Sequence, residues 1–453
     1  MIQGPVRALC DPPHGGSVHA APGAWYYGVE SPRRRVLNVT RVTLFLVFNL
    51  HRPTPTVTAL DRASPHTAAR TRSFTESVIR GMTRLATEHD AINLAQGFPN
   101  FPCPEILKEA AAQAIRADIN QYAVTWGAKR LRQALAQKYA DWYGMTVDPE
   151  TEITVTCGAT EAMASTMLAL VDPGDEVVVL EPFYENYGPD AILCGAKPVF
   201  VPVEPGRPLD LDRLARAFSK RTRAIILCTP NNPTGNVLSR AELDGVADLC
   251  RRHDAYAFTD EIYEHIYFEG EHIPLATFPG MRERTVTVSG LSKTFSITGW
   301  RIGTIVAPAA LTDAIRKVHD FLTVGAPAPL QEAVAVGLET LGQGYYDQLK
   351  TDYDKRRQTL HAGLVAAGFR CTPPAGAYYI LADFSGLSDL PDDEFSFWLT
   401  RAIGVAPVPG SSFYSRPELG RTFVRFAFCK TEPMLQDAVA RLQTVRPKLE
   451  ESR

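Results

Sequence analysis

The 453-residue sequence lacks several features that point to particular functions. Its longest apolar run, residues 42–48, is far shorter than the roughly 20 residues that span a bilayer, so no transmembrane helix is predicted. The net charge is −3 and no Lys/Arg stripe runs through the body of the chain, which argues against a nucleic-acid surface. No G-x-G-x-x-G follows the first predicted strand, which argues against a nicotinamide dehydrogenase.

The eight cysteines form no C-x-x-C pair and no zinc-type spacing, and H-E-x-x-H is also absent. Some of them, such as Cys228 and Cys429, stand within apolar runs, where a free thiol behaves as a small hydrophobic side chain. We therefore expect no structural metal, and a reducing compartment such as the cytoplasm.

The N-terminal segment differs from the remainder of the chain. Residues 1–72 contain nine Arg, no Lys and three acidic residues, so they carry +6 and the remaining chain carries −9. Pro and Gly are frequent, and no helical or strand period emerges. We interpret residues 1–71 as a disordered extension, or as the product of a start codon placed too far upstream. An organelle transit peptide is the less favoured alternative, because Ser is scarce and no amphipathic helix is evident.

From residue 151 to 306 the chain repeats one unit: an apolar run, a turn and a helical stretch. Most runs are continuously apolar, as in strands buried on both faces. Strands that alternate with helices predict an α/β fold with a mostly parallel seven-stranded sheet and helices on both faces. One helix, 241–253, begins at a capping box formed by Ser239 and Glu242. The predicted strands are 153–156, 176–180, 198–203, 223–228, 255–259, 285–289 and 302–306.

A chain of this length exceeds what one hydrophobic core usually serves, so two domains are expected. We predict a large domain over residues 123–335. A smaller α+β domain would combine both chain ends, residues 72–122 with an N-terminal arm and residues 336–453. Its predicted helices are 105–117, 345–367 and 432–442, with short strands around 377–382 and 422–428, while helix 128–143 opens the large domain.

Polar residues follow the predicted strands at the edge where ligands bind open parallel sheets. Small residues at 157–160 open a helix whose free N–H groups suit a phosphate, although an ordinary strand-to-helix turn has the same pattern. Asn232 precedes Pro233 in a turn after the fourth strand. Asp260 ends the fifth strand, where a buried carboxylate needs a partner or caps a helix. Tyr263 follows three residues later.

Lys293 follows the sixth strand among glycine and serine. Small neighbours leave such a lysine close to the backbone, where it loses its charge readily and becomes a nucleophilic amine. Arg301, eight residues later, is suited to bidentate bonds with a phosphate.

This segment resembles the cofactor-attachment signature of the class I and II aminotransferases, which have the fold type I pyridoxal-phosphate architecture. Gly290, Ser292, Lys293, Arg301 and Gly303 fulfil the whole pattern. Asn232, Asp260 and Tyr263 occur in the family's order, and the resemblance covers roughly residues 72–442.

The resemblance implies a role for each of these residues. Lys293 would hold pyridoxal 5'-phosphate (PLP) as a Schiff base and later act as general acid and base. Asp260 would pair with the pyridinium nitrogen, with Tyr263 and Asn232 at the ring hydroxyl. Arg301, Ala159 and Thr160 would hold the phosphate, and Tyr184 would stack on the ring, unless it is simply a core aromatic.

Two further segments, residues 92–99 and 423–430, resemble the branch that contains the kynurenine/glutamine and methionine aminotransferases. In that branch the arginine equivalent to Arg425 binds the substrate's α-carboxylate, and the loop at Gly97 closes over it. Tyr122 resembles a tyrosine that reaches the phosphate of the neighbouring subunit, which implies a homodimer with shared active sites.

The sequence also departs from the family pattern. Gly290 replaces a frequent serine, so one phosphate contact is either missing or supplied by Ser289 or Ser292. No arginine near residues 324–329 matches the one that dicarboxylate-specific relatives use. We therefore expect a transaminase with neutral, aromatic or sulfur-containing amino donors. The alternatives are an aspartate aminotransferase, a cysteine-conjugate β-lyase and, more remotely, a non-catalytic PLP-binding regulator.

Overall fold

The computed structural model describes residues 68–451. Most of the predicted N-terminal extension therefore lies outside the described residues. Its last part belongs to a 3-10 helix, η1 (Ala69–Arg72), so regular structure begins slightly before the predicted position near Arg72.

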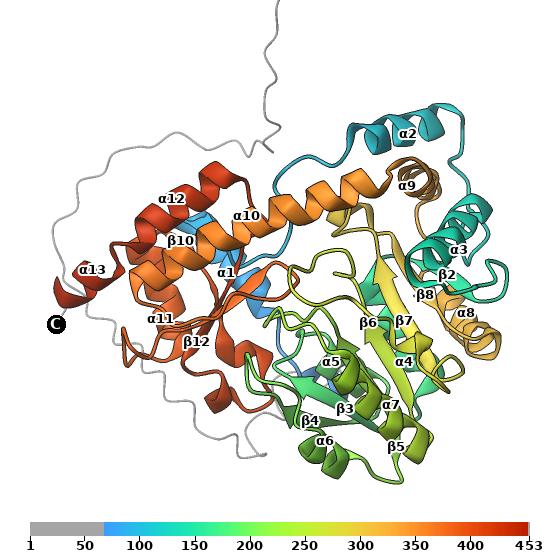
Figure 1. Ribbon diagram of the computed structural model, residues 1–453, viewed down its shortest axis with the longest axis horizontal. Coiled ribbons are helices and arrows are strands. Elements are labelled where there is room, and N and C mark those ends of the chain that lie inside the picture. The colour runs from blue at the N-terminus through green and yellow to red at the C-terminus, as the bar shows by residue number, and fades with distance from the viewer. Residues whose placement is uncertain (1–67, 452–453) are drawn as a thin grey trace, which may run out of the picture. The chain divides into compact units, whose positions relative to one another are not determined.

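A seven-stranded sheet forms the centre of the described chain (Figure 1). Its order is β2-β8-β7-β6-β5-β3-β4, and the strands from β7 to β4 are parallel. Strand β8 is antiparallel to both β2 and β7. The mostly parallel sheet is thus confirmed, and each predicted strand end lies within one residue of the observed one. The strands are β2 (Ile153–Thr156), β3 (Glu176–Glu181), β4 (Lys197–Pro202), β5 (Thr222–Cys228), β6 (Tyr256–Asp260), β7 (Thr285–Gly290) and β8 (Gly303–Val306).

Helices cover both faces of this sheet, which explains why its strands are almost continuously apolar. Successive side chains of a strand point to opposite faces. Val177 and Val179 pack on one face with α4 (Ala159–Leu170), α5 (Tyr187–Leu193) and α8 (Ala309–Thr323). Val178 packs on the other with α6 (Leu211–Ala217) and α7 (Arg240–His253). The predicted capping box of Ser239 and Glu242 starts α7.

Three further helices cover the end of the sheet that carries β2 and β8. They are α2 (Glu105–Arg116), α3 (Lys129–Tyr143) and α9 (Ala328–Thr340), and they share a core cluster with Ile153 and Val306. Helix α2 lies beside α9 in Figure 1. The predicted helices 105–117 and 128–143 are confirmed to within one residue.

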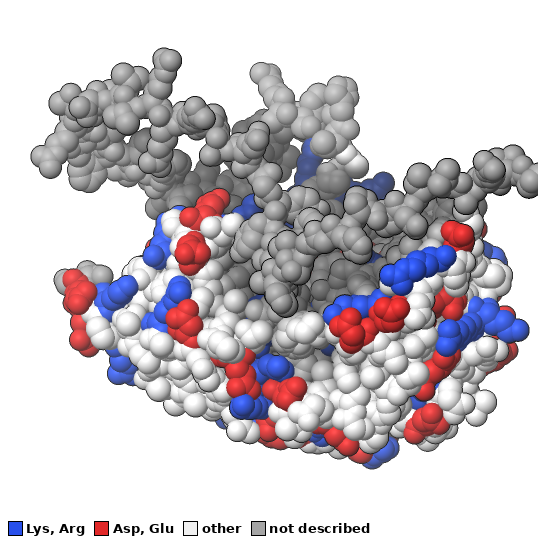
Figure 2. All heavy atoms as spheres, turned by 90° about the horizontal axis from the view of Figure 1, so that it is seen from above, with Lys and Arg blue, Asp and Glu red and all other residues white. Residues whose placement is uncertain are grey.

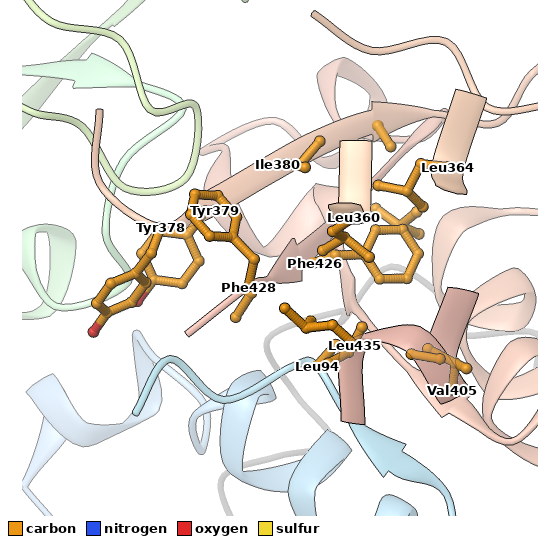
Figure 3. Close-up of a cluster of buried hydrophobic side chains, with 14 of the residues drawn as sticks. Leu94, Leu360, Leu364, Tyr378, Tyr379, Ile380, Val405, Phe426, Phe428 and Leu435 are labelled. Carbon is orange, nitrogen blue, oxygen red and sulfur yellow. The ribbon is translucent and has the colours of Figure 1, made fainter. Parts of the chain in front are cut away.

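A second group of elements surrounds a three-stranded antiparallel sheet of order β11-β12-β9. Beside it, β1 pairs in parallel with β10. Segments near both ends of the described chain meet in its core, where Leu94 lies with Val405, Phe426 and Leu435 (Figure 3). The strands are β1 (Ile92–Asn93), β9 (Tyr379–Asp383), β10 (Val405–Ala406), β11 (Val408–Pro409) and β12 (Phe423–Ala427), and the helices are α1 (Val78–Glu88), α10 (Gln343–Ala367), α11 (Asp392–Trp398), α12 (Glu432–Leu442) and α13 (Val445–Glu451).

Short helical turns complete the described chain: η2 (Leu275–Thr277), η3 (Thr298–Trp300), a π-helix at Leu399–Ile403, η5 (Gly410–Phe413) and η6 (Pro417–Leu419). Within residues 68–451, no helix is both long and apolar enough to cross a bilayer. On the face that Figure 2 shows, basic and acidic side chains are interspersed over the described surface, without a stripe of one sign.

Candidate active site

A cavity of about 500 Å³ lies where β5, β6 and β7 end. It brings together side chains that are far apart in the sequence, as expected at the carboxyl edge of a parallel sheet. Of the eleven residues predicted for the site, ten line this cavity: Gly97, Ala159, Thr160, Tyr184, Asn232, Asp260, Tyr263, Lys293, Arg301 and Arg425. The eleventh, Tyr122, lies elsewhere and is 85% exposed.

Lys293 lies on the cavity wall just beyond β7, and its Nζ donates to the carbonyl oxygen of Gly97 at 3.2 Å. The pKa of this amine is lowered to about 8, mainly by burial and also by the positive charges of Arg301 and Arg425, while Asp260 opposes the shift. A lysine with this pKa is partly neutral near physiological pH, which is the state that acts as a nucleophile or base.

Asp260, the last residue of β6, is buried beneath the cavity. Its Oδ2 accepts a 2.7 Å hydrogen bond from the hydroxyl of Tyr187, and its Oδ1 accepts from the Ile262 N–H at 3.3 Å. Burial raises the pKa of this carboxyl, while the bond from Tyr187 opposes the shift. A cationic ring nitrogen would relieve the cost of burying this charge. Sequence reasoning missed Tyr187, whose only signal is its position three residues after Tyr184.

Arg301 and the first turn of α4 form one corner of the cavity. Arg301 has a left-handed backbone, with φ of 57°, and its guanidinium donates to the carbonyl oxygens of Thr298 and Cys157. A Cβ on Gly158 would lie 2.2 Å from Nη2 of Arg301, and one on Gly303 would lie 2.2 Å from the carbonyl carbon of Gly158. Glycine at both positions therefore lets the guanidinium approach the free N–H groups of the helix.

The two candidate serines near the lysine have different surroundings. The hydroxyl of Ser289 donates to the carbonyl oxygen of Glu261 and to Oε1 of Glu264, away from the cavity. Ser292 lines the cavity. Of the two, Ser292 is the one placed to contact a phosphate.

Arg425 in β12 is 0% exposed and contacts two other parts of the site. Its Nη1 donates to Oδ1 of Asn232 at 2.8 Å and its Nη2 donates to the carbonyl oxygen of Ala95 at 2.6 Å. Nε has no hydrogen-bond partner, and no carboxylate within residues 68–451 forms an ion pair with this guanidinium. The Tyr379 ring lies 4.3 Å from its central carbon. A buried cation without a counter-charge suits an anionic ligand.

Two tyrosines at the start of β9 belong to the site, and sequence reasoning missed both: Tyr379 lines the cavity, and Tyr378 lies behind it. The hydroxyls of Tyr379 and Tyr263 lie 3.0 Å apart, and the hydroxyl of Tyr378 donates to the carbonyl oxygen of Gly97. A Cβ on Gly97 would lie 1.9 Å from the Tyr379 hydroxyl, so this position admits only glycine without rearrangement. In the sequence these tyrosines look like ordinary residues of a buried strand.

The donor set fits PLP by chemical type. A corner of free N–H groups with Arg301 suits its phosphate, a buried carboxylate suits its ring nitrogen, and a lysine of lowered pKa suits its aldehyde. The glycine contacts at Arg301 preserve the space that a phosphate needs.

Comparison with known proteins is consistent with this geometry. Residues 89–442 match the family model described as aminotransferase class I and II. The chain belongs to this family. It is a PLP-dependent aminotransferase, as the lysine segment indicated.

Individual relatives indicate which members of the family this aminotransferase resembles. It is 40% identical over 392 residues to a probable N-succinyldiaminopimelate aminotransferase of Mycobacterium tuberculosis, covering 84% of this chain and 98% of the relative. It is 37% identical to kynurenine–oxoglutarate transaminase 1 of Homo sapiens, covering 78% and 92%. A solved structure from Escherichia coli, described as having a methionine aminotransferase function, superposes with a TM-score of 0.80 at 37% identity and covers 83% and 99%. The predicted kynurenine and methionine branch is therefore confirmed, and the N-succinyldiaminopimelate relative belongs beside it.

Proposed function

We propose that this aminotransferase moves the amino group of an L-amino acid to a 2-oxo acid in two half-reactions at the cavity of Lys293, with neutral, aromatic or sulfur-containing donors favoured. The observation that carries the proposal is that Lys293 and Arg425 line the same cavity. A buried guanidinium with no carboxylate partner supports binding of the α-carboxylate, which would hold the amino group of the substrate near Nζ.

PLP, when bound, supplies an electron-withdrawing ring that accepts the electron pair of the breaking Cα–H bond. The chain's own residues would do the remainder. Lys293 would take the Cα proton on Nζ and return it at the other end of the reacting system. Asp260 would keep the ring nitrogen protonated, with Tyr187 holding the carboxylate in place.

The remaining predicted residues would position the cofactor and the substrate. Arg301, Ala159, Thr160 and Ser292 would bind the phosphate, and Tyr184 would stack on the ring. Asn232 and Tyr263 would contact the ring hydroxyl. The Gly97 loop, held by Lys293 and Tyr378 through its carbonyl oxygen, would cover the substrate and exclude water.

We also propose that the enzyme works as a homodimer with shared active sites. Several apolar side chains are exposed in two segments, residues 119–124 and 321–324. A hydrogen bond between Nε2 of His319 and the carbonyl oxygen of Thr125 links these two parts of the chain. An exposed apolar patch of this kind supports a protein–protein contact. It consists of Ile119, Tyr122, Val124, Phe321, Leu322 and Val324. Tyr122 would then reach the phosphate of the partner's site.

The cysteines support a place in the cytoplasm. All seven cysteines of the described residues are free, and Cys228, Cys250 and Cys429 are buried. Free thiols of this kind are typical of a reducing compartment.

A two-step titration tests the proposed reaction. Adding an amino acid alone to the purified holoenzyme should abolish the visible absorbance of the lysine-bound cofactor, and a 2-oxo acid should restore it. The rival β-elimination would instead release pyruvate and ammonia from a cysteine conjugate without any oxo-acid acceptor. Absorbance that does not respond to any amino acid in a broad panel would contradict the proposal.

A further inference from the structure

Four cationic side chains line the cavity, together with the carboxylates of Asp260, Asp190 and Glu185. Lys293, Arg301 and Arg425 each have a function in the proposed reaction, as the base, at the phosphate and at the α-carboxylate. A fourth cation, Arg80 of α1, also lines the cavity and has no assigned partner. Arg80 lies outside residues 324–329, where sequence reasoning looked for a second substrate-binding arginine.

The backbone of Arg80 is fixed to the active-site wall through Ser77. Ser77 caps α1, and its Oγ accepts a hydrogen bond from the Arg80 N–H at 3.3 Å. The same hydroxyl donates to Oε1 of Glu185 at 2.6 Å. Glu185 follows Tyr184, the residue proposed to stack on the ring, and all four residues line the cavity. The position of Arg80 is thus tied to the wall that would face the substrate.

The guanidinium of Arg80 is free to bind a ligand. Within residues 68–451 its side chain makes no hydrogen bond or ion pair. Arg84, one turn further along α1, is different, because its Nη1 and Nη2 bind Glu76 at 2.6 and 3.0 Å. Arg84 has the largest effect in lowering the pKa of Glu76, because it hydrogen-bonds that carboxylate, and the charge of Arg80 lowers this pKa to a smaller extent. Oε1 of Glu185 accepts from Ser77, and Arg80 bonds neither carboxylate.

We propose that Arg80 is a specificity-determining residue that binds the distal carboxylate of a dicarboxylic substrate while Arg425 binds the α-carboxylate. The proposal rests on the proposed transaminase function and extends it to a substrate class. A guanidinium favours a carboxylate over any neutral group because it can donate two parallel charge-assisted hydrogen bonds. The substrate is either a dicarboxylic amino donor or a dicarboxylic 2-oxo acceptor. Neutral donors remain substrates, because their side chains do not need Arg80.

The kinetic test compares Arg80→Met with Arg84→Met. Methionine keeps the length and apolar stem of arginine and removes the charge, and both positions are on the exposed side of α1. We expect Arg80→Met to lower kcat/KM for glutamate or 2-oxoglutarate roughly tenfold, mainly through KM, as for the loss of one hydrogen bond to a charged group. Values for alanine and pyruvate should stay unchanged, and Arg80→Lys should recover part of the loss. Comparing the loss for glutamate with the loss for 2-oxoglutarate shows whether Arg80 binds the amino donor, the oxo-acid acceptor or both.

A binding measurement separates this proposal from the proposed function. Glutarate and butyrate are non-reacting probes of similar length that differ by one carboxylate, and their binding to the holoenzyme can be followed by its absorbance. We expect Arg80→Met to weaken glutarate roughly tenfold and to leave butyrate unchanged. Equal weakening of both probes, no weakening of either, or the same selective loss in Arg84→Met would overturn the proposal. An enzyme that binds glutarate through Arg80 but transfers no amino group would contradict only the proposed reaction.

Discussion

Nη1 of Arg425 lies 2.8 Å from Oδ1 of Asn232, and this bond joins the three-stranded sheet to the seven-stranded sheet. Arg425 belongs to β12 of the three-stranded sheet, and Asn232 follows β5 of the seven-stranded sheet. The proposed carboxylate site therefore exists only when both sheets are in place. Asn232 would help to orient both the cofactor and the guanidinium.

Arg425→Lys should weaken substrate binding while leaving the cofactor in place. Lysine keeps the charge but has only three N–H donors on one nitrogen, so it cannot bond Asn232 and the Ala95 carbonyl oxygen and also make a two-point contact with a carboxylate. We expect kcat/KM for amino donors to fall roughly ten- to hundredfold, the effect of losing a hydrogen bond between charged groups. Steady-state kinetics measure this, with the visible absorbance as the control for bound PLP. Unchanged kinetics would contradict the proposed carboxylate site.

Gly158→Ala should weaken the cofactor site, and Gly299→Ala provides a matched control. A Cβ at Gly158 would collide with Arg301, and the φ of 85° is itself unfavourable for alanine. Gly299 also lines the cavity, but a Cβ there meets nothing within 4 Å. We expect the Kd of PLP, measured by absorbance titration, to rise at least roughly tenfold for the first variant only, because one charge-assisted contact is lost. Equal affinity in both variants would rule out Arg301 and Gly158 as the phosphate corner.

The pKa of Lys293 sets the pH dependence of cofactor attachment. Only the neutral amine attacks an aldehyde, and burial lowers the pKa of Lys293 to about 8. The attachment rate of PLP to the apoenzyme should therefore rise roughly tenfold per pH unit below the pKa and level off above it. Stopped-flow absorbance measures this rate. A rate that keeps rising toward the pKa of a free lysine would show that the amine is not desolvated.

His319 should make the stability of the enzyme depend on pH. Its Nδ1 lies 2.8 Å from Oε1 of Glu161 and its Nε2 lies 2.7 Å from the carbonyl oxygen of Thr125, so the doubly protonated ring satisfies both acceptors. Burial lowers the pKa of His319, but the hydrogen bond and charge of Glu161 outweigh it, and the pKa is raised overall.

The sign of the effect follows from this raised pKa. The stabilisation is fully present below the unfolded pKa of about 6.5 and is lost as the pH rises through the folded value. Chemical denaturation of the wild type and of His319→Gln should give a difference in unfolding free energy that shrinks with rising pH. A difference that is constant across this range would show that His319 is not charged in the folded enzyme.

The central sheet was predictable because most of its strands are buried on both faces. Val177 and Val178 contact opposite helix layers, so both must be apolar, and a continuous apolar run marks the strand. The direction of β8 was not predictable in the same way. Its antiparallel pairing with β2 and β7 depends on the chain connection and leaves no trace in the period of the side chains.

The site was predictable where a motif fixes the spacing, as around Lys293. Tyr187, Tyr379 and Arg80 were missed because each reaches the site only through the folding of the chain, and no local sequence motif marks its position. Tyr187 touches Asp260 across 73 positions, and Tyr379 touches Tyr263 across 116. In the sequence, Arg80 looks like any charged residue on an amphipathic helix, and only the fold shows that it lines the cavity.

Borohydride reduction of the holoenzyme followed by peptide mass mapping tests the central claim, that the chemistry takes place at Lys293. Reduction fixes the cofactor to the amine that carries it. We predict a single modified peptide with the cofactor on Lys293, and no modification when an amino donor has first released the lysine. Cofactor fixed to another lysine, or a Lys293 peptide that stays unmodified, would contradict the account.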